Sequence, residues 1–263
     1  MIRLLRLTLF ACAIFASPIV PASTKTTDIT DMWWISTESG WGLNVTLQYD
    51  VAFLTFFIYD SSNTPYWVVA TANFQGPSGA DLLWSGDLYA TTGPWFGGPF
   101  DPGAVASRKA GTASFRLTSV DEAQLTYTID GVAVNKVVQR QTWKSEIYSG
   151  GYSGGYSFRN TGCMPSSLNG LQEDVGTIDV NHSGSSWSAA FNGTLSSCTF
   201  GGTYSQAGKL GEVSGNYNCA DGTAGTFDLV EIAGTISGFS GRMSGHSQFC
   251  QWTGTFGGIV RSQ

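Results

Sequence analysis

Glu38 is the acidic side chain whose sequence surroundings most favour chemistry. It lies close to a group of tryptophans, Trp33, Trp34 and Trp41. Burial beside these rings would raise the pKa of a carboxyl group and suit it to general-acid catalysis. A structural interpretation competes with this one, in which Glu38 is buried and pairs with Arg140 or with backbone amides. A hydrolase that uses Glu38 is therefore one of the functions that the sequence leaves open.

The other acids and the histidines give weaker indications of catalysis. Glycoside hydrolysis needs a second carboxylate within about 5–9.5 Å, and the candidates are Asp60, Asp87 and Asp101. The first and last of these precede turn residues, which favours a turn-capping role. Both histidines, His182 and His246, lie in polar Ser- and Gly-containing segments that are typical of exposed turns. The sequence has no calcium loop and no His-based metal motif, so we expect no metal or other cofactor.

Aromatic side chains are the second group that could bind a ligand. Seven of the nine tryptophans lie between positions 33 and 143, which is more than a core of that size needs. Ring faces with a polar rim suit sugar rings or flat apolar molecules. The alternative is that the indoles fill and cover a barrel. The predicted ligand-binding residues are Trp34, Glu38, Trp41, Trp67, Trp95, Phe96 and Arg140.

The amino-terminal segment has the composition of a secretory signal. Arg3 and Arg6 precede an apolar stretch over 7–20, and small residues follow at 21–23. This order of basic, apolar and small residues is typical of a signal peptide, and the apolar stretch is shorter than the roughly 20 residues of a membrane span. We therefore expect a signal helix over 1–23 that is removed, a secreted or periplasmic protein, and no transmembrane segment in the mature chain.

Four cysteines remain after the signal, and all lie in the second half of the chain. An even number in an exported protein favours two disulfides, whereas a zinc site would need closely spaced pairs. If 208–211 forms a turn, Cys198 and Cys219 lie opposite each other on adjacent strands, at a distance that suits a bridge. Cys163, on the first strand of its domain, then pairs with Cys250, on the last.

The strands expected in the first half follow a period of two. From Trp41 the alternation places Leu43 and Val45 on one face of a half-buried strand, preceded by an aromatic loop. The segment 51–59 is apolar on both faces, so we expect it to be covered on both sides. Asp130-Gly131 predicts a two-residue hairpin turn, with a return strand that runs to Trp143. The Gly- and Pro-rich segment 92–103 predicts a long loop that its aromatic residues hold in place.

The second half repeats this pattern with more glycine and a thinner apolar content. Segment 148–156 repeats Tyr-Ser-Gly-Gly and could be a linker or, from position 154, a first strand. Asn192-Gly193 and Asp221-Gly222 predict hairpin turns. Terminal-strand arginines in small barrels of the lipocalin and avidin type often stack on a first-strand aromatic ring. By that analogy we expect Arg140 over Trp41 and Arg261 over Tyr156.

The first half also resembles a group of secreted bacterial proteins without a known activity. The resemblance covers roughly residues 33–143, with Asn63 where Gly is usual. It implies a shared fold and no particular function. Its motifs are Trp33-Trp34, Glu38-Ser39-Gly40-Trp41-Gly42-Leu43-Asn44, Tyr59-Asp60, Pro65-Tyr66-Trp67, Ser85 to Pro94, Phe100-Asp101-Pro102, Gly111-Thr112-Ala113, Tyr127 to Gly131 and Arg140-Gln141.

Together these features predict an all-β protein of two tandem small antiparallel meander barrels of lipocalin or avidin type, over 31–145 and 152–263. Charged residues are only 12% of the chain, the net charge is −6, and no basic cluster occurs. Nucleic acid is therefore excluded as a partner. The expected function is non-catalytic binding of a small apolar molecule or a glycan at the Trp-rich mouth of the first barrel. A structural or adhesive role on other surface proteins is the alternative, beside the hydrolase.

Overall fold

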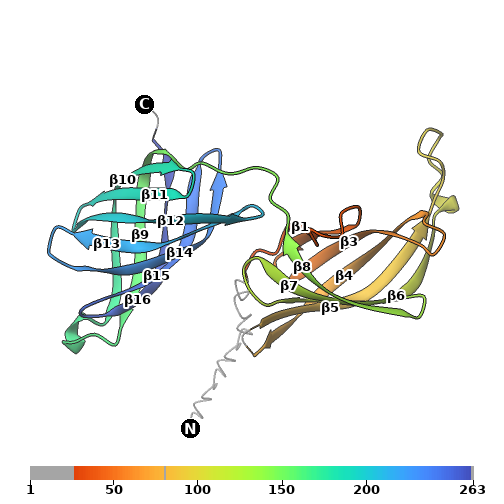
Figure 1. Ribbon diagram of the computed structural model, residues 1–263, viewed down its shortest axis with the longest axis horizontal. Coiled ribbons are helices and arrows are strands. Elements are labelled where there is room, and N and C mark those ends of the chain that lie inside the picture. The colour runs from red at the N-terminus through yellow and green to blue at the C-terminus, as the bar shows by residue number, and fades with distance from the viewer. Residues whose placement is uncertain (1–26, 80, 262–263) are drawn as a thin grey trace, which may run out of the picture.

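The computed structural model of the chain describes residues 27–79 and 81–261, which form two closed antiparallel β-barrels (Figure 1). Strands β1–β8 form the first barrel and β9–β16 the second. Strands that are neighbours in sequence are also neighbours in the sheet, which is the meander that the sequence predicted. The all-β class and the two-barrel architecture are therefore confirmed. The predicted signal segment 1–23 lies outside the described residues.

The first barrel contains eight strands and one short 3₁₀ helix, η1 (Pro102–Ala104). The strands are β1 (Asp31–Trp34), β2 (Gly42–Gln48), β3 (Val51–Tyr59), β4 (Pro65–Ser78), β5 (Asp81–Thr92), β6 (Ala106–Leu117), β7 (Glu122–Ile129) and β8 (Val132–Arg140). The sequence did not predict β1, which pairs with β2 and β8 and so closes the barrel. β8 also ends at Arg140, three residues before the predicted end at Trp143, which is 71% exposed.

The second barrel also contains eight strands and one 3₁₀ helix, η2 (Ser166–Leu168). The strands are β9 (Gly150–Thr161), β10 (Gly170–Ser183), β11 (Ser186–Gly193), β12 (Ser197–Ala207), β13 (Leu210–Cys219), β14 (Ala224–Thr235), β15 (Gly238–Ser247) and β16 (Gln251–Val260). From Gly150 on, the Tyr-Ser-Gly-Gly repeat belongs to strand β9, and its first two residues, Tyr148 and Ser149, end the linker that precedes the strand. A side chain at Gly155 would lie 1.9 Å from the Asp174 carbonyl oxygen, so close strand contact explains its glycine.

Turn chemistry set the strand register as the sequence predicted. In the hairpin β7–β8, Ile129 pairs with Val132 and Tyr127 with Val134. Asp130 has a φ of 49°, in the left-handed region that the two-residue turn requires. In the second barrel Cys198 pairs with Cys219 across β12 and β13.

Both predicted disulfides are present. Cys198 and Cys219 are bonded, and so are Cys163 and Cys250, at the ends of the first and last strands of the second barrel. Two disulfides in a chain of this size are typical of a protein that folds outside the cytoplasm. In the part of the chain that the structure describes, no helix has the length and apolar character needed to cross a membrane.

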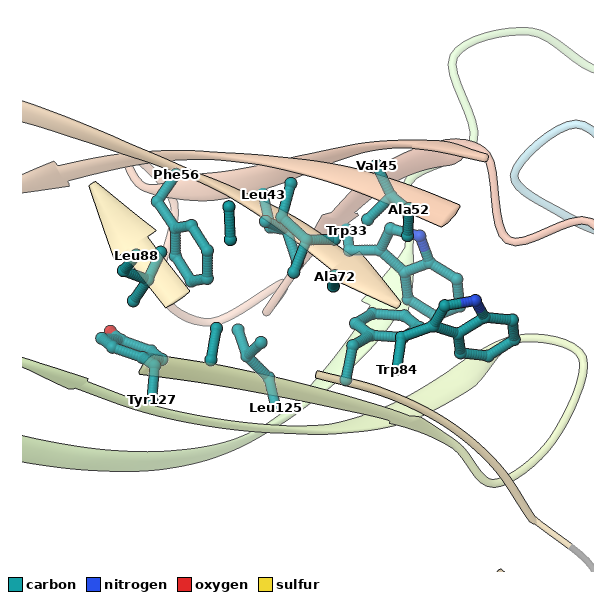
Figure 2. Close-up of a cluster of buried hydrophobic side chains, with 14 of the residues drawn as sticks. Trp33, Leu43, Val45, Ala52, Phe56, Ala72, Trp84, Leu88, Leu125 and Tyr127 are labelled. Carbon is teal, nitrogen blue, oxygen red and sulfur yellow. The ribbon is translucent and has the colours of Figure 1, made fainter. Parts of the chain in front are cut away.

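The interior of the first barrel is filled with side chains. Trp33 and Trp84 have no exposed surface and pack on either side of Phe115, with ring centroids 4.9 and 6.4 Å from it. Farther along the barrel, Phe56 contacts Tyr127 edge to face at 5.2 Å. Figure 2 shows Trp33, Trp84, Phe56 and Tyr127 with surrounding aliphatic side chains between the strands. Two of the seven clustered tryptophans therefore serve as core.

The outer face of β3 is not covered as predicted. Phe53, Phe57 and Tyr59 are 45%, 48% and 55% exposed, and Trp67, which pairs with Phe57 on β4, is 51% exposed. The opposite face of the strand points into the barrel, where Leu54 is fully buried. Within residues 27–79 and 81–261, neither a loop nor the second barrel covers these rings, so this outer aromatic face is exposed.

The two barrels meet at one end of each. We call this the proximal end of the first barrel, and the opposite end its distal end. Two backbone amides in the turn between β12 and β13 donate hydrogen bonds to the first barrel and the segment after it. Lys209 N donates to Asp31 Oδ2 of β1 at 3.0 Å, and Gly208 N donates to Thr142 Oγ1, just after β8, at 2.9 Å. Lys209 Nζ also pairs with Asp28 at 2.6 Å. A side chain at Gly208 would lie 2.1 Å from the Asp31 carboxylate, so this contact requires glycine.

Candidate functional site

The second barrel has a cavity of about 560 Å³ at the end that faces away from the first barrel. Its lining comes from the ends of β9, β13 and β15, the starts of β10, β12 and β16, and the loops between them. The opposite end of this barrel is closed by Tyr148, which precedes β9 and is 4% exposed. Figure 1 shows the cavity end, with the η2 loop, at the far left of the molecule. The second barrel is therefore closed at the end near the first barrel and open at the other end.

A stack of three aromatic rings forms one wall of the cavity. Tyr156 and Phe158 are two positions apart on β9, so they share one face of the strand. Their rings stack with centroids 4.5 Å apart and an angle of 10° between the planes. Phe158 then stacks on Trp252 of β16 at 4.6 Å. Phe158 stacks on both of the other rings, whereas Tyr156 and Trp252 each stack on one. This wall is therefore apolar and rigid.

The lining also contains polar residues, namely Asn160, Gln172, Glu173, Ser196, Tyr217, Asp221, Thr223 and Ser247. Trp252 Nε1 donates to the Tyr217 hydroxyl at 3.2 Å. Among the described residues this hydroxyl has no acceptor for its own proton, which can therefore be donated to a ligand. Asn160 is 9% exposed and donates through Nδ2 to the Leu168 carbonyl at 3.3 Å, which ties the η2 loop to β9. The cavity can therefore hold an apolar molecule and donate a hydrogen bond to it.

Asp174 holds the turn that forms one side of the opening. Its carboxylate accepts hydrogen bonds from the backbone amides of Thr194, Leu195 and Ser196, between 2.9 and 3.0 Å. Burial favours a raised pKa for this carboxyl, but these hydrogen bonds and that of the Thr194 hydroxyl outweigh it and hold the pKa well below its usual value. The Leu195–Ser196 turn is therefore fixed, and Tyr156 contacts it through the Ser196 hydroxyl at 3.2 Å.

Apolar side chains and both disulfides surround the opening. Leu171, Leu195 and Phe249 are 56%, 82% and 46% exposed and line the cavity. Cysteines of both disulfides lie in the same lining. The cross-links therefore hold the open end, where neighbouring strands separate into loops, and this preserves the shape of the cavity.

The predicted ligand-binding residues Trp34, Glu38 and Trp41 lie at or near the distal end of the first barrel. Glu38 Oε2 accepts from Trp41 Nε1 at 2.8 Å and pairs with Lys136 at 2.5 Å. The Lys136 ammonium also lies over the Trp41 ring, 4.9 Å from its centroid. Trp34, in β1, is partly buried and pairs with Gln139 of β8.

The expected surroundings of Glu38 were wrong. Its side chain is 43% exposed and pairs with Lys136, whereas the sequence predicted a buried group paired with Arg140. The hydrogen bonds from Lys136 and Trp41 lower the pKa of Glu38 below its usual value, whereas burial was expected to raise it. A carboxylate that stays ionised is poorly suited to donate a proton.

Arg140 is at the proximal end, far along the barrel from the other predicted site residues. Its side chain has no exposed surface and lies over the Trp33 ring, 4.6 Å from its centroid. It donates to the Val120 carbonyl at 2.5 Å and the Asp28 carbonyl at 2.7 Å, and pairs with Asp31 at 3.2 Å. Arg140 therefore seals the proximal end of the first barrel.

The predicted stacking partners of the two arginines were wrong. Arg140 stacks on Trp33 instead of Trp41 because β1 is the strand that pairs with β8. Arg261 was expected over Tyr156 but pairs with Asp179 of β10. The first barrel therefore does have an arginine stacked on a ring of its first strand. The ring is Trp33 of β1, one strand before the one that the sequence predicted.

Trp67, Trp95 and Phe96 remain at the surface. Trp95 and Phe96 belong to the loop between β5 and β6 and are 71% and 97% exposed. The sequence predicted that the aromatic residues hold this loop in place, but Phe100 is also 72% exposed, so none of the three packs against the barrel. The structure brings Glu38 and Trp41 together and separates them from Arg140.

His182 and Asp60 have structural roles, whereas His246 is exposed as expected but lies in strand β15 and not in a turn. His182, expected in an exposed turn, is 5% exposed: its Nδ1 accepts from the Tyr148 amide and its Nε2 lies 3.0 Å from the Gly184 carbonyl. The linker residue Tyr148 covers it, which local sequence does not reveal. Asp60 caps its turn as predicted, and no group of metal-binding side chains occurs in 27–79 or 81–261.

Sequence reasoning missed the cavity of the second barrel. Two features of the sequence indicate it. Tyr156 and Phe158 lie two positions apart and so share one face of a strand, and all four cysteines lie near strand ends that meet at one end of the barrel. Comparison with models of known protein families and with curated protein sequences finds no match. The resemblance of the first half to secreted bacterial proteins therefore stays a prediction.

Proposed function

We propose that the chain is a non-catalytic binding protein that takes up a small, mainly apolar molecule in the open end of the second barrel. The observation that carries this proposal is the cavity of about 560 Å³ with its aromatic wall. Binding sites for small molecules are typically apolar clefts of about 300–1,000 Å³ with a few polar groups. The cavity supports the binding function that the sequence predicted, at a different place in the molecule.

The chemistry of the wall favours an apolar molecule over a glycan. Sugar rings bind best on free aromatic faces, and stacking within this wall uses Phe158 twice and one face each of Tyr156 and Trp252. Leu171 and Leu195 add aliphatic surface at the opening. The Tyr217 hydroxyl offers one donor, which suits a ligand with a single acceptor oxygen such as a carbonyl or carboxyl group.

The location that we infer for this activity is outside the cytoplasm. The two disulfides support an oxidising compartment. The composition of segment 1–23 supports export through a cleaved signal peptide, to the periplasm or the medium. A binding protein in either place would meet small apolar molecules in water, where burial of their surface favours uptake.

The two other functions have less support. A hydrolase would need Glu38 as an acid, and the lowered pKa of that carboxyl opposes the role. An adhesive protein that acts by strand addition would need an unpaired edge strand, and in the described part of the chain both sheets are closed. The exposed aromatic face of β3 and β4 is the remaining observation that favours an adhesive role.

The apolar fluorescent probe 1-anilinonaphthalene-8-sulfonate tests the proposal. We expect its fluorescence to rise on binding to the exported protein, and Thr223→Trp, which fills the opening, to weaken this binding about tenfold or more. Ile236→Trp is the matched control, because it adds the same bulk to a fully exposed residue at the closed end. Equal probe binding by Thr223→Trp and the wild type would overturn the proposal.

Competition then separates ligand classes. Fatty acids and flat aromatic carbonyl compounds should displace the probe, whereas soluble oligosaccharides should not. Displacement by oligosaccharides alone would keep the cavity as a binding site but reverse the choice of ligand.

A further inference from the structure

The loop 93–105, which we call the distal loop, carries an unusual exposed aromatic surface. It joins β5 and β6, and Figure 1 shows it reaching beyond the distal end of the first barrel, at the far right of the molecule. Trp95, Phe96 and Phe100 are 71%, 97% and 72% exposed. We call these three side chains the aromatic tip. Large apolar surfaces left in water mark sites of interaction.

Backbone hydrogen bonds shape the distal loop. Gly98 N donates to the Trp95 carbonyl at 3.2 Å, which closes a turn at the tip. Asp101 accepts from Gly103 N at 2.9 Å and caps η1 at the base of the loop. The Trp95 ring lies over Gly97 within the loop, yet Trp95, Phe96 and Phe100 all keep most of their surface exposed, so these rings remain available to enter another apolar phase.

The distal loop carries no cation, and its one charged residue is the acid Asp101 beside Phe100. No charged residue occurs between Tyr89 and Phe100. The cations at the base of the loop, Arg108 and Lys109, are paired with acids, Arg108 with Asp130 at 2.5 Å and Lys109 with Asp87 at 2.8 Å. An anionic partner would therefore gain little attraction here, and a partner that offers only an apolar phase suits the tip better.

Amphipathic aromatic residues surround the base of the loop. Tyr59, Trp67 and Tyr89 lie on the outer face at the distal ends of β3, β4 and β5 and are 55%, 51% and 40% exposed. Tyr and Trp concentrate where proteins meet the headgroup region of membranes, because one edge of the ring is apolar and the other forms hydrogen bonds. Their position behind the tip matches that level of a bilayer.

We propose that the aromatic tip inserts into the surface of a lipid bilayer and docks the first barrel there. A protein partner would need a broad complementary patch, about 800 Å² from each side, whereas the tip is three rings on one narrow turn. A bilayer accepts such a projection without shape complementarity. Because the cavity of the second barrel lies at the opposite end of the molecule, a docked protein presents that cavity to the surrounding water.

Co-flotation with phosphatidylcholine vesicles tests this inference. The experiment uses the exported protein, so that the apolar stretch of segment 1–23 is removed and does not itself bind lipid. We expect the protein to float with the vesicles, and the triple variant Trp95→Ala, Phe96→Ala, Phe100→Ala to lose about tenfold or more of its partition coefficient. All three side chains are exposed, so the variant should keep the circular dichroism spectrum and melting temperature of the wild type.

Two controls make the result specific. Ile236→Ala removes a fully exposed apolar side chain at the closed end of the second barrel, and it should float like the wild type. Salt at about 0.5 M should leave flotation unchanged, because the proposed binding does not depend on attraction between charges. Three results would each overturn the inference: no flotation of the wild type, equal flotation of the triple variant, or binding that needs anionic lipid and disappears in salt. Thr223→Trp should float normally, so failure of the ligand proposal would be distinguishable.

Discussion

The two barrels share a strand number and a topology, but they differ in what fills them. In the first, Trp33, Trp84 and Phe115 occupy the interior, and Arg140 seals the proximal end. In the second, aromatic rings stack along the wall and leave a cavity of about 560 Å³ at one end. The number of tryptophans therefore does not predict which barrel contains a cavity, because two of the seven indoles of the first barrel fill its interior.

The barrels also differ in what stabilises them. The first depends on a continuous packed core and on the buried ion pair between Arg140 and Asp31. The second has an open end, and two disulfides and the hydrogen bonds of Asp174 hold its loops. A barrel with a cavity gives up core packing, and cross-links at the opening compensate for that loss.

Among the changes that test the difference between the barrels, removal of the Cys163–Cys250 disulfide should lower the free energy of unfolding most. This bridge spans 87 residues and joins the first and last strands of the second barrel. We expect Cys163→Ser with Cys250→Ser to lower the free energy of unfolding by about 4–5 kcal/mol. The Cys198–Cys219 bridge spans 21 residues, so its removal should cost about 3 kcal/mol.

Urea denaturation, followed by hydrogen exchange to resolve each barrel, measures these effects. Amides of β1–β8 should keep their protection in both variants. Equal loss of protection in both barrels would show that the first barrel also depends on the cross-links, and the comparison would fail.

Truncation of Arg140 tests the first barrel in the same way. Arg140→Ala leaves the Asp31 carboxylate buried without its partner and removes the cation over Trp33. Breaking a buried pair in this manner costs about 3–5 kcal/mol. Unfolding in urea, monitored by tryptophan fluorescence, should show this loss, and Lys144→Ala, at an exposed position in the linker, should unfold like the wild type. A loss below about 1 kcal/mol for Arg140→Ala would mean that the seal is unimportant.

Asp174 gives the second barrel a dependence on acid. Its pKa is lowered in the folded state, so its contribution to stability is complete above the ordinary value of 3.8 and is lost as the pH falls below that value. Asp174→Asn should cost about 2–3 kcal/mol at neutral pH and should flatten the acid limb of the stability curve. Chemical denaturation at several pH values measures both. If the variant lost stability at low pH as the wild type does, that loss would come from groups other than Asp174.

Neutralisation of Glu38 should have the smallest effect. Its contacts with Lys136 and Trp41 are exposed, and exposed pairs contribute little to stability. We expect Glu38→Gln to unfold like the wild type and to bind the apolar probe equally well. Carbon-detected NMR titration of Glu38 in the wild type should give a pKa below its usual value of 4.5. A raised value there would return Glu38 to consideration as a general acid.

Local sequence patterns predicted the parts of the fold that local chemistry decides. Asp130-Gly131 favours one turn and one register, and the same logic placed Cys198 opposite Cys219. Strand β1 escaped prediction because its four residues lack a clear alternation and its role depends on pairing with β8, about a hundred residues away. Contacts between distant segments are not encoded in the period of one strand.

The candidate site was not predictable for a related reason. The volume inside a barrel is the sum over side chains from eight strands, so no single motif shows whether it is filled. His182 illustrates the same limit, because a polar turn in sequence becomes buried when Tyr148 from the linker covers it. Glu38 escaped burial because Lys136, from another strand, holds it at the surface.

Mapping of a bound apolar probe by NMR tests the central claim most directly. The exported protein, labelled with ¹⁵N, would be titrated with 1-anilinonaphthalene-8-sulfonate, and amide shifts would be followed in both barrels. The account predicts saturable shifts around Leu171, Leu195 and Trp252 at the open end of the second barrel, and none at the buried core of the first. Saturable shifts at Trp33 and Trp84, with none at the open end of the second barrel, would contradict it.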